Sequence, residues 1–189
     1  MINLYPKVTK SIKKNLDLHH KLYKKIRCKA EYLEELIVSS LRFNNFVVDW
    51  DPASHDKEKD IVVNETNKIQ IKSGTFQKQK STITISGHRL GRFKGDLKKV
   101  TEYLNSSSSD TISVFNPDKN SEKHLYTVAS ISREILKGLK YDKWEKENTT
   151  YRQTNILGVE FSLRESMSWQ IWWVIPTKLI KIEENILIE

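Results

Sequence analysis

The chain has 189 residues, a single cysteine and a formal net charge of +8 at pH 7. Its length predicts one domain built around a single core. The lone cysteine, Cys28, excludes an internal disulfide and a multi-cysteine zinc site, and it is typical of the reducing cytoplasm. No apolar stretch reaches transmembrane length, and the first residues are too highly charged for a signal peptide. We therefore expect a cytoplasmic protein with no membrane partner.

Positive charge is concentrated at the N-terminal end of the chain. Residues 1–30 contain nine lysines and arginines but only one acidic residue, Asp17. An uneven basic charge of this kind favours a polyanionic partner, although the same charge also keeps a protein soluble.

Helical spacing runs through the N-terminal part of the sequence. Apolar residues recur at intervals of three and four from Ile12 to Ile37, which indicates one long helix or two helices with a bend near His19. Such a seam could pack against another subunit or across the protein's own core. Over residues 31–43, Glu34 falls at the edge of the apolar face, whereas Glu35 points away from it.

The most informative stretch is a predicted hairpin between residues 59 and 74, after a short strand over 46–50. Side chains alternate along a strand, so Gln70 and Lys72 share one face of the second hairpin strand. Asp60 begins the first strand and can lie beside them. A carboxylate, an amide oxygen and an ammonium would then converge at the edge of a sheet. These groups can hold a hard divalent cation and activate a water molecule beside it.

The order of a helix with Glu34, a strand, Asp60 and then Gln70-x-Lys72 resembles the core of the PD-(D/E)XK nucleases, over roughly residues 30–105. The resemblance implies an α/β fold with a restriction-endonuclease-like core, in which helices flank a central mixed β-sheet. It also implies Mg²⁺-dependent hydrolysis of phosphodiester bonds in double-stranded DNA, with Mn²⁺ able to replace Mg²⁺. The sequence departs from the family pattern at Gln70, where an acid is usual, and at Lys59, where proline is common.

The resemblance also implies roles for individual residues. Lys72 would orient or deprotonate the attacking water and offset charge on the scissile phosphate. Glu35 is the alternative to Glu34 as the helix carboxylate. A chain of this kind resembles a type II restriction endonuclease, commonly a homodimer on a palindromic site. The groups that would hold the ion are Asp60, the Gln70 side chain, the Ile71 carbonyl and Glu34.

A basic segment that contains glycines follows the motif. We expect a strand over residues 81–85 and an open turn over 86–89, where glycine permits close approach of the backbone. This segment could grip phosphate or read guanine edges, or it could form only a solvated basic turn. The residues expected to contact DNA are Ser73, Lys78, Lys80, His88, Arg89, Arg92 and Lys94.

The remaining chain predicts further strands and helices. We divide the single domain into a basic helical segment (1–30), a catalytic core of αβββαβ type (31–128) and a C-terminal part (129–189). Trp172 and Trp173 are expected in the core. The predicted elements are a helix over 96–104, strands over 111–115 and 124–128, a helix over 131–139 capped by Ser130, an exposed loop over 140–155, and a hairpin that joins 159–163 to 169–175.

Two other functions fit the same pattern. A structure-selective nuclease, such as a junction resolvase or repair endonuclease, would use the same centre on branched DNA. A catalytically silent DNA-binding module would account for the neutral Gln70. Cleavage of plasmid DNA in the presence of Mg²⁺ would separate the silent module from both enzymes.

Overall fold

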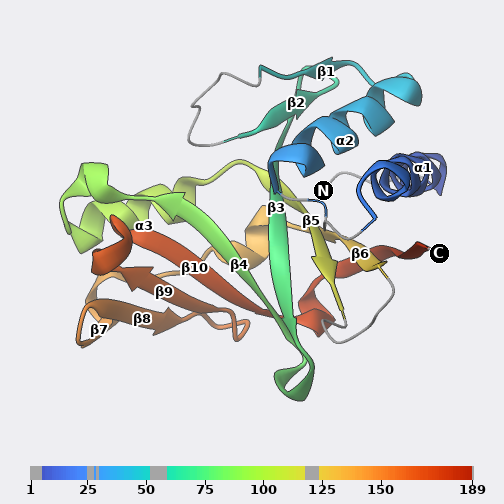
Figure 1. Ribbon diagram of the computed structural model, residues 1–189. Coiled ribbons are helices and arrows are strands. Elements are labelled where there is room, and N and C mark those ends of the chain that lie inside the picture. Colours follow the sequence, from blue (N-terminus) through green and yellow to red (C-terminus); the bar gives the residue numbers. More distant parts are fainter. Residues whose placement is uncertain (1–5, 25–27, 29, 52–58, 118–123, 189) are drawn as a thin grey trace.

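The computed structural model describes residues 6–24, 28, 30–51, 59–117 and 124–188. Within these ranges three α-helices lie against one 11-stranded sheet (Figure 1). No helix in this part of the chain is long and apolar enough to cross a membrane. The helices are α1 (Pro6–Leu22), α2 (Ala30–Phe43) and α3 (Leu97–Ser106). The strands are β1 (Val48–Asp49), β2 (Ile61–Val63), β3 (Asn67–Gln77), β4 (Thr82–Arg89), β5 (Asp110–Asn116), β6 (His124–Ile131), β7 (Glu145–Glu147), β8 (Thr150–Thr154), β9 (Glu160–Arg164), β10 (Gln170–Pro176) and β11 (Lys181–Ile188).

The sheet is mixed and has β3 near its centre. Its strands follow the order β11-β6-β5-β3-β4-β10-β9-β8-β7, while β2 joins β3 and β1 joins β2. β3 runs parallel to β5, and the other pairs among the described strands are antiparallel. The predicted α/β architecture, a mixed sheet flanked by helices, is therefore confirmed.

Two hydrophobic clusters lie on the two faces of the sheet. Helices α1 and α2 cover one cluster, to which β3 contributes Ile69 and Ile71. Helix α3 belongs to the other, with Phe115 of β5 and Phe161 of β9. Because side chains alternate along each strand, β3, β5 and β6 supply residues to both clusters.

The N-terminal helical seam forms two helices and packs within the chain. Val8, Ile12 and Leu16 repeat every four residues on α1 and are fully buried, where α1 meets α2 and β11. After α2, Asn45 adopts a left-handed conformation (φ 64°), which asparagine tolerates better than most residues. Of the two alternatives for this seam, packing across the protein's own core is the one observed.

A buried contact fastens α1 to β6. The His20 Nε2 atom lies 2.7 Å from the Tyr126 hydroxyl, which also accepts a hydrogen bond from the Cys28 main-chain N–H. The His20 ring stacks on His124, with 3.7 Å between ring centroids. Burial is the main cause that lowers the His20 pKa to about 4, with His124 and His19 acting in the same direction. Burial also raises the pKa of the Cys28 thiol to about 11.

Tertiary pairing overrides several local predictions. The predicted turn over 86–89 is wrong, because β4 continues to Arg89 beside β10. The helix predicted over 131–139 is also wrong. Ser130 and Ile131 extend β6 by pairing with β5, and only a short 3₁₀ turn follows, with Ser132 as its cap. Cross-strand hydrogen bonds thus replace a locally plausible helix cap.

The C-terminal part contains more strand than predicted. The expected loop over 140–155 includes the hairpin β7–β8. Residues 181–188 form β11 along β6, a strand that was not predicted. The hairpin β9–β10 is confirmed, and β10 ends at Pro176. Trp173 is buried as predicted, whereas Trp172 lies half-buried under the Arg164 guanidinium.

Candidate active site

The candidate site lies where two strands diverge along one edge of β3. β2 pairs with residues 67–69 and β4 with residues 74–77, while β5 occupies the opposite edge along residues 69–75. Among the described strands, none pairs with residues 70–73 on the edge shared by β2 and β4. We call this opening the β2–β4 fork (Figure 1).

Asp60 takes the place of a strand partner in the fork. Its main-chain N–H donates to the Ile69 carbonyl at 2.9 Å, and its Oδ2 atom accepts from the Ile71 N–H at 2.6 Å. The N–H and C=O of one strand residue point to the same edge, so the Ile71 carbonyl also faces the fork. A carboxylate and a main-chain carbonyl are thus presented together.

Lys72 completes a compact ion pair with Asp60. The Nζ atom lies 3.0 Å from Asp60 Oδ2, and these side chains are only 21% and 17% exposed, respectively. Partial burial of an ammonium is tolerated here because the carboxylate lies against it. The predicted approach of Asp60 to Lys72 is therefore present in the structure.

Glu34 on α2 interacts electrostatically with Asp60 and Lys72. Burial raises the pKa of its carboxyl, and the negative charge of Asp60 raises it further, while Lys72 opposes this effect. Glu35 instead is exposed and lines a shallow pocket with Arg42 and Phe43. Of the two glutamates considered from the sequence, Glu34 is the one whose carboxyl interacts with Asp60 and Lys72.

Gln70, two residues before Lys72 on β3, is buried and contacts His88. The amide nitrogen of Gln70, which is 2% exposed, lies 2.7 Å from His88 Nε2. Burial lowers the pKa of His88 to about 4, and the charge of Lys72 adds to this effect, so the imidazole is neutral at pH 7. The prediction that His88 lies on a DNA-facing turn is corrected: it is on β4, beside Gln70. The sequence offered no signal for this contact.

The other basic residues of the segment fall into separate groups. Arg89 and Lys94 are exposed, whereas the Arg92 guanidinium stacks over Phe93 and Tyr103, at 4.7 and 4.3 Å from the ring centroids. Ser73 is exposed on β3 beside the fork. The remaining two residues of the predicted set, Lys78 and Lys80, lie in the 3₁₀ turn that joins β3 to β4, at the end of this hairpin that is farther from the fork (Figure 1). At about 3.3 Å per residue, that tip is roughly 20 Å along the strand from Lys72.

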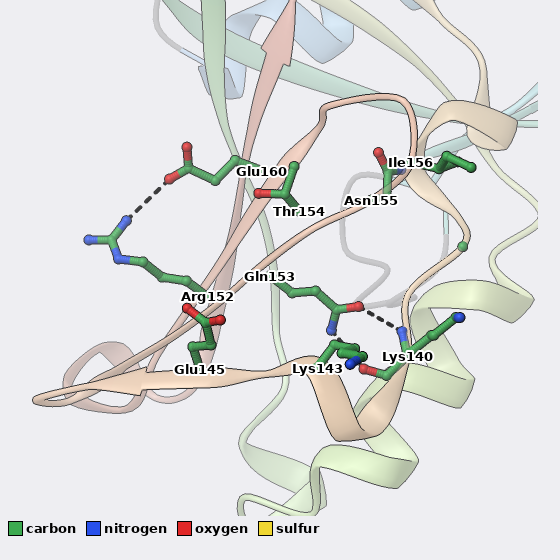
Figure 2. Close-up of a pocket in the computed structure, with 10 residues that line it drawn as sticks. Lys140, Lys143, Glu145, Arg152, Gln153, Thr154, Asn155, Ile156 and Glu160 are labelled. Atoms are coloured by element: carbon green, nitrogen blue, oxygen red, sulfur yellow. Dashed lines mark hydrogen bonds and ion pairs between the residues drawn. The ribbon is translucent and has the colours of Figure 1, made fainter.

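An open pocket of about 740 Å³ lies beside β8, away from the fork residues (Figure 2). The Gln153 amide donates to the Lys140 carbonyl at 2.8 Å and accepts from the Lys140 N–H at 2.7 Å. Arg152 is paired with Glu160 at 3.2 Å. These interactions tie β8 to the segment before β7 and to β9. The lining residues are Gly138, Lys140, Lys143, Glu145, Arg152, Gln153, Thr154, Asn155, Ile156 and Glu160.

The donors around the fork fit a hard cation. The Asp60 carboxylate and the Ile71 carbonyl face the fork, the Glu34 carboxyl interacts electrostatically with Asp60, and Gln70 on the same strand carries an amide oxygen. All of these are oxygen ligands of the type that Mg²⁺ binds. The described residues contain no cluster of three or more histidine, cysteine, aspartate or glutamate side chains arranged around a metal position. The candidate set therefore depends on its amide and main-chain oxygens as well as on carboxylates.

Comparison with known proteins adds no relative: no protein-family model, curated protein or solved structure matches this chain.

Proposed function

We propose that the protein is a Mg²⁺-dependent endonuclease that hydrolyses phosphodiester bonds in double-stranded DNA. The observation that carries the proposal is the Asp60–Lys72 ion pair, 3.0 Å long, held in the β2–β4 fork against the Ile71 main chain. An acid, a lysine and a main-chain carbonyl in one partly buried opening are suited to metal-assisted hydrolysis. Sequence-specific cleavage by a homodimer, as in type II restriction, is the form that we propose.

The oxygen donors of Asp60, Glu34, Ile71 and Gln70 would hold the ion. Mg²⁺ in this position would polarise the scissile phosphate and acidify a bound water molecule. Asp60 already fixes the Lys72 ammonium, which can then donate a hydrogen bond to the attacking water. The same ammonium can offset the negative charge that develops on the phosphate.

Charge and surface position support DNA as the substrate. The net charge of +8 attracts a polyanion, and Arg89 and Lys94 are exposed on the chain that leads away from the fork. Because Arg92 stacks on two aromatic rings, its guanidinium is held in a fixed position from which it can contact a phosphate.

A catalytically silent DNA-binding module is the second candidate. The burial and neutrality of Gln70 favour it, because this position brings no charge to the fork. A silent module would bind the same DNA through the same basic residues but would leave the phosphodiester bonds intact.

Supercoiled plasmid incubated with the protein and Mg²⁺ or Mn²⁺ tests the proposal. We expect discrete fragments from the parent, and losses of about 100-fold or more for Asp60→Asn and Lys72→Ala. Glu34→Gln should also reduce cleavage, whereas Glu35→Gln, one residue away on the same helix, should not. Circular dichroism and DNA-binding assays establish that each variant folds and still binds.

Each outcome has a distinct meaning. Full cleavage by both Asp60→Asn and Lys72→Ala would overturn the proposed centre. DNA binding without cleavage in either metal would favour the silent module. Cleavage confined to branched substrates would indicate a structure-selective nuclease instead.

A further inference from the structure

Residues 89–95, which we call the basic loop, join the end of β4 to α3 and present three cations. Arg89, Arg92 and Lys94 are all exposed, and none of them forms an ion pair with a carboxylate in the part of the chain that the structure describes. The loop continues directly from His88, whose imidazole contacts β3. Cations that the protein itself leaves without an anion are suited to the phosphates of DNA.

The turn that precedes β10 holds the basic loop at both of its ends. Near the start of the loop, the Leu90 main-chain N–H donates to the Trp169 carbonyl at 2.9 Å. A Cβ atom at Gly91 would lie 3.3 Å from the Ser168 carbonyl oxygen. At the end of the loop, a Cβ atom at Gly95 would lie 2.7 Å from Cη2 of Trp169, so only glycine allows this approach.

Trp169 has a backbone conformation that tryptophan rarely adopts. Its φ is 58°, as is that of Ser168, and this left-handed region is unfavourable for a bulky side chain. The backbone therefore gives no reason for a tryptophan here, whereas the contacts of its ring do. The indole stacks on Tyr151, with 5.8 Å between centroids and 23° between planes, and its outer edge lies against Gly95. Unfavourable backbone conformations that are kept for a specific contact concentrate at functional sites.

We propose that Trp169 is a positioning residue that holds the basic loop in one conformation for contact with the DNA backbone. This inference rests on the proposed DNA substrate and deepens it. Ordering a loop and its long cationic side chains on binding costs free energy, and a loop that is held before binding avoids part of this cost. Arg92 already stacks on Phe93 and Tyr103, and the contacts of Trp169 fix the main chain on either side of it.

The same substitution at two tryptophans separates positioning from general packing. Trp169→Phe keeps an aromatic ring beside Tyr151 but lacks the outer ring atoms that reach Gly95. Trp172→Phe is the matched control, because Trp172 lies under Arg164 and not against the loop. The affinity for a short DNA duplex is measured by fluorescence anisotropy without divalent metal. We expect Trp169→Phe to weaken binding about 3-fold and Trp169→Leu, which also removes the stack, about 10-fold, whereas Trp172→Phe should stay within about 2-fold of the parent.

A second background shows whether Trp169 acts through the loop. When Arg89, Arg92 and Lys94 are all replaced by alanine, Trp169→Phe should cause no further loss of affinity, and circular dichroism establishes that each variant is folded. Parental affinity in both Trp169→Phe and Trp169→Leu, or an undiminished effect of Trp169→Phe without the three cations, would overturn the positioning role.

The outcomes also separate this role from the proposed nuclease. If the parent binds the duplex but cleaves plasmid in neither Mg²⁺ nor Mn²⁺, the nuclease proposal fails, and the affinities of the Trp169 variants still decide the role of this residue. If the parent cleaves and both Trp169 variants bind as tightly as the parent, only the role of Trp169 fails. A parent that binds no duplex would overturn both.

Discussion

Acidification should destabilise the protein through His20, the residue that fastens α1 to β6. Its imidazole is 5% exposed and its pKa in the folded protein is lowered to about 4, from 6.5 in the unfolded chain. Between these values the unfolded chain binds more protons than the folded chain, so the free energy of unfolding falls as the pH falls. The contribution of His20 is complete above pH 6.5 and is lost as the pH approaches 4.

The expected magnitude follows from the two pKa values. At pH 5 the unfolded chain is almost fully protonated at His20 and the folded chain is not, which corresponds to a loss of about 2 kcal/mol. Around the ring, the neighbouring histidines His19 and His124 oppose protonation, while Asp17 favours it only weakly. Below pH 4 both states are protonated, and this contribution should level off.

The measurement is urea unfolding followed by tryptophan fluorescence at several pH values between 7.5 and 4.5. His20→Gln is the comparison, because its amide oxygen can still accept from the Tyr126 hydroxyl but does not titrate. The free energy of unfolding of the variant should fall less on acidification, because position 20 no longer takes up a proton. His88, which also has a lowered pKa, is present in both proteins and does not affect the comparison. Parallel curves for the parent and His20→Gln would show that protonation of His20 does not cause the loss of stability.

Three further predictions concern the fork and its surroundings. Gln70→Glu should retain cleavage, with a changed preference between Mg²⁺ and Mn²⁺, because a carboxylate still supplies an oxygen ligand. Gln70→Ala should cleave poorly at limiting metal, and parental activity there would contradict the ligand role. Arg89→Ala should lower the slope of log affinity against log salt by about one if its guanidinium holds a phosphate; an unchanged slope and affinity would leave it a solvated side chain. Gly87→Ala should reduce the free energy of unfolding by about 1–3 kcal/mol, because its Cβ would lie 2.7 Å from Ile171 Cγ2. Urea unfolding measures this loss, and a stability equal to the parent's would mean that β4 and β10 can separate at this point.

The approach of Asp60 to Lys72 could be predicted because it depends on a local hairpin. The connecting turn has three residues, 64–66, and Asn64 and Glu65 both have positive φ there, so the register follows from this short turn and the alternation of the strands. Glu34 could be chosen over Glu35 because helical geometry alone separates their directions.

The contact of His88 with Gln70 could not be predicted from the sequence. It depends on how β4 pairs with β10, a strand about 80 residues later in the chain, and on the irregular register of that pairing. Similarly, Ser130 has the local features of a helix cap, but β5 and β11 supply cross-strand partners that no local pattern reveals.

The central position of β3 has a consequence for local motion. Its residues alternate between the two hydrophobic clusters, so Ile71 belongs to one cluster while Phe76 packs against the other. β3 cannot detach from the sheet without exposing both clusters, so the amide hydrogens that it donates to β5 should be among the slowest to exchange with solvent. Lys72 lies on this strand, which means that the ammonium at the fork is carried by backbone that local opening should not release.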